Sequence, residues 1–141
     1  MSTLANRYAS PEMKAIWSTE SRYSAERQLW LTILRFQAKN GVNVPPSAIA
    51  DYERMIDSID LVSIDKHERA LRHDIKARID EFNSLAGHEL IHLGMTSRDL
   101  TETIEAHQIL TSLTLIRDRA IALLVALARK ADEYKIGRAH V

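Results

Sequence analysis

SRDLTETIEAHQILTSLTLIRDRAIALLVALARKADEYK, residues 97–135, contains neither glycine nor proline. At a rise of about 1.5 Å per residue, this run predicts a single helix of roughly 55–60 Å. Its apolar residues recur at helical spacing in two adjacent seams. The first seam contains Ile109, Leu113, Ile116, Ala120, Leu123, Leu127 and Tyr134, and the second contains Ile121, Leu124, Val125 and Ala128. A helix that is apolar on two sides needs partners on both. We therefore expect it to pack against other subunits or a further part of the polypeptide, the alternative being a long helix in a monomeric bundle.

The rest of the chain is also predicted to be helical. Only four glycines and three prolines interrupt the 141 residues, and no strand-like alternation of apolar residues competes with the helical spacing. We expect helices over about 10–17, 18–40, 46–59, 61–72 and 74–85, with boundaries at the start signals Ser10-Pro11, Ser18 or Thr19 and Pro45-Pro46 and at the stop signals Asn40-Gly41 and Gly87. In the helix over 74–85 the expected core side carries Ile75, Ile79 and Phe82, and the charged residues Lys76, Arg78, Asp80 and Glu81 are expected elsewhere. The sequence therefore predicts an all-α fold.

Composition excludes several classes of function. Nineteen basic and nineteen acidic residues cancel, so no global field favours nucleic acid or a membrane surface. The chain has no cysteine, which excludes disulfides, thiolate zinc sites and thiol nucleophiles and fits a reducing compartment. No uncharged run approaches the 18 or so residues of a membrane span. We expect one cytoplasmic globular domain that binds neither nucleic acid nor membranes.

The segment ahead of the long helix is a candidate anion-binding site. It reads GHELIHLGMTSRDLTE from Gly87 to Glu102, with Thr96 and Ser97 as N-cap candidates and Asp99 in the expected first turn. The N–H groups and the positive dipole end of a helix start suit a carboxylate or a phosphate. The alternative is that a hydroxyl residue followed by acids only begins the helix.

Two other polar clusters are candidate binding residues. Arg72-His73-Asp74 lies between two expected helices and offers a donor, a titratable group and an acceptor. In the simpler interpretation Asp74 is an N-cap and Arg72 interacts with a helix dipole. An arginine and a phenol, as in Arg7-Tyr8, can hold a phosphate, but near a terminus such residues are more often solvated.

A metal site is not expected from the six histidines. His88 and His92 stand four residues apart, but the HExxH order is missing and glycines flank a segment too short for a firm helix. We expect His67 and His107 to be ordinary surface or interface residues.

Three motifs in order resemble the N-terminal part of the adenylosuccinate lyase family, within the fumarase/aspartase superfamily. They are RYASPEMKAIWS (7–18), RHDIKARIDEFN (72–83) and IHLGMTSRDLTE (91–102), and the resemblance extends from about Arg7 to Tyr134. It implies a mostly helical homotetramer with a central bundle of long helices. It also implies elimination of fumarate from adenylosuccinate and from the succinyl-carboxamide ribotide of purine nucleotide synthesis, with no metal or organic cofactor.

Site residues follow from this resemblance position by position. Arg7 and Tyr8 match a pair that holds the nucleotide phosphate, and Arg72, His73 and Asp74 match a substrate-binding triplet with His73 near the reacting centre. Thr96 and Ser97 match the hydroxyls that grip a carboxylate of the succinyl group. We expect all three clusters to form part of one pocket. The family's catalytic serine lies in a region beyond residue 141, so neither the base nor the acid of the reaction is assigned here.

The last six residues, IGRAHV, only partly match the family's catalytic-histidine motif. Gly137, Arg138 and His140 fit it, but Ala139 replaces a Ser or Thr and the spacer is too short. The codons ATC GGA AGA GCA CAC GTC, which resemble a common sequencing adapter, encode the same peptide. We expect residues 1–95 to form an N-terminal helical domain, 96–135 the first, truncated long helix of the bundle, and 136–141 a non-native tail, and we expect the chain alone to be inactive. The alternatives are another lyase of the superfamily and a non-catalytic helical interaction module.

Overall fold

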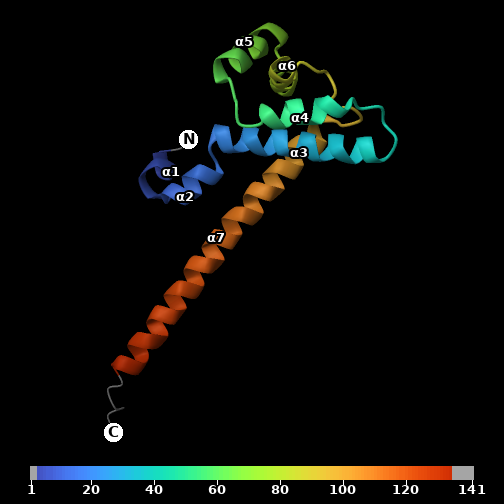
Figure 1. Ribbon diagram of the computed structural model, residues 1–141. Helices are drawn as coiled ribbons and strands as arrows, with labels where there is room; N and C mark the ends of the chain where they lie inside the picture. Colours follow the sequence, from blue (N-terminus) through green and yellow to red (C-terminus); the bar gives the residue numbers. More distant parts are fainter. Residues whose placement is uncertain (1–2, 135–141) are drawn as a thin grey trace, which may run out of the picture.

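The computed structural model describes residues 3–134, and these residues form seven α-helices and no β-strand (Figure 1). The helices are α1 (Thr3–Tyr8), α2 (Pro11–Ile16), α3 (Thr19–Lys39), α4 (Pro46–Arg54), α5 (Leu61–Leu71), α6 (Asp74–Ala86) and α7 (Ser97–Glu133). The all-α prediction is confirmed. Two details differ from the sequence prediction, because α1 was not foreseen and α4 ends at Arg54 rather than near Ile59.

Short polar side chains and glycine set the helix boundaries. The Ser10 hydroxyl accepts a hydrogen bond from the Met13 N–H, and Pro11 begins α2, where its missing N–H costs nothing. Ser18 caps α3 in the same way, through the Ser21 N–H. Gly87 ends α6 with φ 74°, a left-handed conformation that a residue without a Cβ adopts readily.

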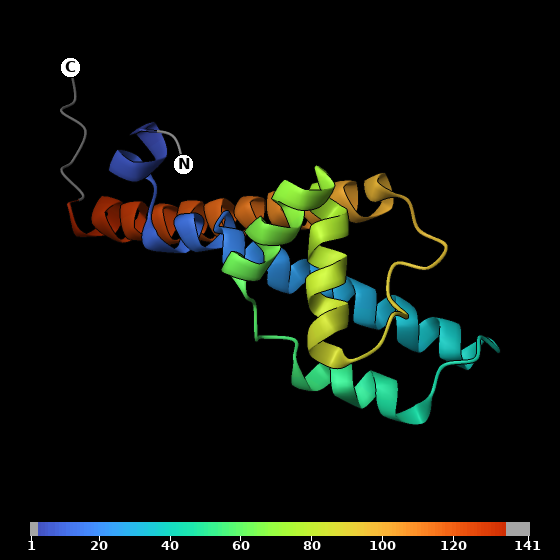
Figure 2. The ribbon, with the colours of Figure 1, turned by 90° about the horizontal axis from the view of Figure 1, so that it is seen from above.

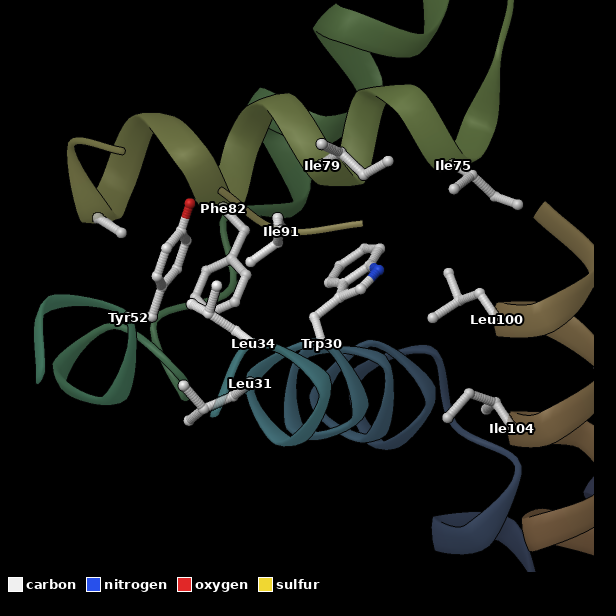
Figure 3. Packing of buried hydrophobic residues seen from close by; sticks show 11 residues of the cluster. Trp30, Leu31, Leu34, Tyr52, Ile75, Ile79, Phe82, Ile91, Leu100 and Ile104 are labelled. Atoms are coloured by element: carbon white, nitrogen blue, oxygen red, sulfur yellow. The ribbon is translucent and has the colours of Figure 1, made fainter. Parts of the chain in front are cut away.

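The hydrophobic core lies where α3, α4, α6 and the first turns of α7 meet. Figure 2 shows α6 crossing over α3 and α4, and Figure 3 shows Trp30 at the centre of the cluster with Ile75 and Leu100 toward one end. The buried cluster comprises Trp30, Leu31, Leu34, Tyr52, Ile75, Ile79, Phe82, Ala86, Ile91, Leu100 and Ile104. Fully burying a large apolar side chain contributes about 1.5–3 kcal/mol, so this cluster is the main source of stability of the helical domain.

Two buried ion pairs also join α3 to α6. The Arg27 guanidinium donates to both Glu81 carboxylate oxygens at 2.8 and 2.6 Å, and Arg78 Nε lies 2.6 Å from Glu26 Oε2. All four side chains are almost fully buried. The expectation that Arg78 and Glu81 lie away from the core is therefore wrong. Their charges are tolerated there because α3 supplies an opposite charge for each of them.

The first turns of α7 are fixed to the rest of the chain along one stripe. Its buried residues are Leu100, Ile104, Gln108 and Ser112, each one turn after the last. The Gln108 amide donates to the Ile16 carbonyl at 2.8 Å, and the Trp17 indole donates to the Ser112 hydroxyl at 3.0 Å. These bonds tie α2 to α7.

Beyond Ser112, no residue of α7 is buried, although an exposed ion pair at 2.9 Å still joins Arg119 to Glu12 of α2. The later turns extend away from the other helices (Figure 1). Large apolar side chains on this part are 45% to 65% exposed: Leu113, Ile116, Ile121, Leu123, Leu124, Val125 and Leu127. Within the described part of the chain, no helix is long and apolar enough to cross a lipid bilayer. Apolar surface of this extent usually marks an interaction site.

We expect Arg27→Met to lower the free energy of unfolding by about 3–5 kcal/mol, because it leaves the buried Glu81 carboxylate without a partner. The matched control is Arg98→Met, which breaks an ion pair with Glu102 whose two side chains are 80% and 62% exposed. It should cost less than about 1 kcal/mol. The measurement is the urea midpoint at constant m value. Equal losses in the two variants would contradict the structural role of the buried pair.

We expect the chain to self-associate through the exposed apolar part of α7, because that surface is unfavourable in water. Leu123→Glu combined with Leu127→Glu should shift the sedimentation coefficient toward that of a monomer. Val62→Glu is the control, because Val62 is 80% exposed but lies on α5. Association that survives the α7 double substitution would show that another surface is responsible.

Candidate functional site

The start of α7 is a complete capping box. The Thr96 hydroxyl accepts from the Asp99 N–H at 3.4 Å, and the Asp99 carboxylate accepts from the Thr96 N–H at 2.7 Å. Thr96 is exposed and Ser97, the first residue of α7, is half-buried. The N-cap prediction for Thr96 is confirmed. The chain's own carboxylate already occupies part of this helix start, so an external anion would bind next to Asp99.

The Arg72-His73-Asp74 triplet forms the turn between α5 and α6. Arg72 has φ 53°, and its N–H closes α5 by donating to the Glu68 carbonyl at 2.7 Å. The His73 imidazole is the N-cap of α6 and accepts from the Lys76 N–H through Nδ1 at 3.3 Å. The interpretation of Asp74 as the N-cap is therefore wrong, because His73 fills that role and Asp74 is the first helical residue.

The Asp74 carboxylate is held by the buried charges behind it. Arg78 Nη1 lies 3.2 Å from Asp74 Oδ2, while the same guanidinium binds Glu26. Partial burial would raise the pKa of Asp74, but the Ile75 N–H and the Arg78 guanidinium outweigh it and hold that pKa below its ordinary value. Asp74 is therefore an ionised acceptor at neutral pH, with one side fixed to the core.

The structure brings the triplet and the start of α7 close together. In Figure 3, Ile75 at the start of α6 and Leu100 in the first turn of α7 lie at the same end of the core. The Trp30 indole nitrogen, which donates to His92 in the segment before α7, points toward this same end of the core (Figure 3). Burial lowers the pKa of the half-buried His92 imidazole, and His73 adds to this, whereas Asp99 opposes it. His92 was not predicted from the sequence as a binding residue, because its place near the two clusters depends on the tertiary fold.

Arg7 and Tyr8 lie elsewhere in a single chain. Both are exposed at the end of α1, and Figures 1 and 2 both show α1 well away from the junction of α5 and α6. The clefts lined by Asp74 include neither Thr96 nor Ser97, so the expectation that the clusters form part of one pocket stays a prediction. The assignment of Arg7 and Tyr8 to that pocket stays a prediction.

Two open clefts meet at the triplet and share Glu68 and Asp74. The first is lined by Asp65, Glu68, Arg69, Arg72, His73 and Asp74. The second is lined by Trp17, Ser18, Thr19, Arg22, Tyr23, Glu68, Asp74 and Arg78. The arginines offer donors to anionic oxygens, and the carboxylates offer acceptors to hydroxyl or amine groups. The second cleft was not predicted from the sequence, although Arg78 falls on the same helical stripe as Ile75 and Ile79 and could have indicated a buried cation.

The two histidines considered for a metal bind different partners. His88 Nε2 lies 2.8 Å from Asp51 Oδ2, and His92 Nδ1 lies 3.0 Å from the Trp30 indole nitrogen. Among residues 3–134, no group of three or more His, Cys, Asp or Glu side chains could hold a metal ion. His140, with Gly137 and Arg138 of the C-terminal motif, lies outside the described residues.

Comparison with known proteins gives a consistent set of relatives. No protein-family model matches the sequence. The adenylosuccinate lyase of Archaeoglobus fulgidus is 32% identical over 138 residues, which cover 95% of this chain and 31% of that protein. The Saccharomyces cerevisiae enzyme of the same name is 31% identical, with 94% and 28% covered. The Streptococcus mutans protein is 30% identical, with 97% and 33% covered.

The chain thus spans about a third of the length of these curated relatives. The similarity extends over nearly all of its own residues, including the α5–α6 turn and most of α7. The chain is homologous to the adenylosuccinate lyases and corresponds to their N-terminal region.

Proposed function

We propose that this chain is the N-terminal part of a C–N lyase that eliminates fumarate from adenylosuccinate and from the related succinyl-carboxamide ribotide in purine nucleotide synthesis. The observation that carries the proposal is the similarity to adenylosuccinate lyases over 95% of the chain. The proximity of the α5–α6 turn to the start of α7 supports it, because both clusters are proposed to contact one substrate.

Each cluster has a proposed role in binding a substrate with anionic groups at both ends. Arg7 and Tyr8 hold the nucleotide phosphate, as a guanidinium and a phenol are suited to do. Thr96 and Ser97 hold a carboxylate of the succinyl group. The exposed position of α1, away from the α5–α6 turn, fits a pocket in which the phosphate contact comes from another copy of the chain.

The triplet lies where the reacting part of the substrate is proposed to bind. Arg72 supplies an exposed cation, Asp74 an ionised acceptor, and His73 is a candidate assisting residue. Elimination needs a base to remove a proton from the carbon next to a carboxylate and an acid to protonate the departing nitrogen. We assign these two groups to the remaining part of a full-length homotetrameric enzyme. The same remainder would cover the exposed seams of α7.

Fumarate should bind this chain weakly and should shift the amide NMR signals of Thr96 and Ser97, because their hydroxyls are proposed to hold a carboxylate. Ser97→Ala should reduce the shifts, whereas Ser84→Ala, at an exposed position of α6, should not. The affinity of the chain for AMP should likewise fall in His73→Ala. It should not change in His107→Ala, because His107 is an exposed histidine on α7. No fumarate should form from adenylosuccinate. Shifts confined to other surfaces would exclude this site, and fumarate release would show that the chain is catalytically complete.

Arg72→Gly should stabilise the fold and weaken ligand binding together. Glycine adopts φ 53° without the Cβ clash of an L-residue, so the free energy of unfolding should rise by up to about 1 kcal/mol. Loss of the guanidinium should weaken AMP binding in the same titration. Arg72→Ala removes the charge but keeps the backbone strain, so it should weaken binding without stabilising the chain. Unchanged AMP affinity in both variants would show that Arg72 only ends α5.

A further inference from the structure

Two residues other than glycine have positive φ among residues 3–134, namely Arg72 at 53° and His92 at 64°. Arg72 belongs to the proposed substrate site, and His92 lies in the segment that leads to Thr96 and Ser97. A left-handed conformation costs an ordinary L-residue about 1–2 kcal/mol, so it persists only where neighbouring groups hold it. The left-handed conformation of Arg72 is held by the bond from its N–H to the Glu68 carbonyl, which ends α5. His92 does not end a helix, so other contacts must hold its conformation.

Three contacts fix the chain at His92. The Trp30 indole N–H donates to His92 Nδ1 at 3.0 Å, with the two rings nearly perpendicular at 88°. The Met95 N–H closes a turn onto the His92 carbonyl at 3.3 Å, and the Gln37 amide donates to the Leu93 carbonyl at 2.9 Å. Trp30 is the most firmly placed of these groups, because it is 1% exposed and stacks against Phe82.

The bond from Trp30 also selects the protonation state of His92. An indole nitrogen can only donate, so Nδ1 must be the unprotonated acceptor and the proton of the neutral ring must sit on Nε2. A protonated imidazole would place one N–H against another and lose the bond. Burial lowers the pKa of His92 and so favours the neutral ring as well, while Asp99 favours the cation.

We propose that Trp30 is a positioning residue of the substrate site, which fixes His92 as the neutral Nε2–H tautomer between the α5–α6 turn and the start of α7. This inference rests on the proposed function. Trp30 lies in the core and acts only through His92. Its indole thus determines that the imidazole offers an N–H donor, rather than a lone pair or a positive charge, on the nitrogen that faces away from Trp30. An N–H donor suits a carboxylate or phosphate oxygen.

The test compares Trp30→Phe with Tyr52→Phe. Both substitutions remove a hydrogen-bonding group from a buried ring that packs against Phe82, but the Tyr52 hydroxyl donates to Asn83 and to the His88 carbonyl. Nitrogen-15 NMR of the histidine rings reports the tautomer of His92, and a fumarate titration reports binding. In the native chain and in Tyr52→Phe we expect the Nε2–H tautomer and equal affinities. In Trp30→Phe we expect a mixture of tautomers, a higher His92 pKa and about three- to tenfold weaker fumarate binding, the range for losing one hydrogen bond.

Several outcomes would overturn the inference. An Nδ1–H or mixed tautomer in the native chain contradicts it even if Trp30→Phe fails to fold. An unchanged tautomer or an unchanged fumarate affinity in folded Trp30→Phe contradicts it too. If the native chain has the Nε2–H tautomer but shows no response to fumarate, the proposed function fails, and the positioning role falls with it. The ring signals and the binding data thus separate the two failures.

Discussion

The two buried ion pairs between α3 and α6 are the constraint on which the candidate site depends. Arg27 binds Glu81 and also donates to the Met55 carbonyl, while Glu81 accepts from the Asp60 N–H, so one pair joins α3 and α6 to the segment between α4 and α5. The other pair extends outward through Arg78 to Asp74. Such pairs contribute little net stability but tolerate only one geometry, since a buried charge without its partner is costly. They therefore fix the position of the first turn of α6 relative to α3, and with it the position of the triplet.

The candidate site is formed by helix ends rather than by helix faces. The triplet ends α5 and begins α6, and Thr96 begins α7. Core residues fix how these ends lie, because Ile75 and Leu100 pack into one cluster. Only Arg7 and Tyr8 lie outside this arrangement, on a short helix without buried residues. Binding groups on such a helix can serve a neighbouring copy without disturbing the core of their own.

Most helix boundaries could be predicted from the sequence because local chemistry sets them. Ser10, Ser18, Thr96 and Gly87 act through their own backbone and one or two nearby N–H groups. Helix α1 was missed because it buries nothing and so carries no apolar periodicity. The buried charges were missed because a charged residue on a helix usually faces water, and the opposite charge lies 52 to 54 positions away. The proximity of His92 to the triplet likewise depends on long-range packing, and the assignment of the seven binding residues to one pocket stays a prediction.

Helix α7 is one uninterrupted element from the candidate site to its far end. At about 1.5 Å per residue its 37 residues measure about 55 Å. A tilt of about one degree at Thr96 therefore displaces the far end by about 1 Å. The converse also holds. Contacts made by the distal turns of α7 act about 55 Å from its start and so influence the orientation of its first turn. The orientation of the Ser97 hydroxyl is thus coupled to contacts made several nanometres away.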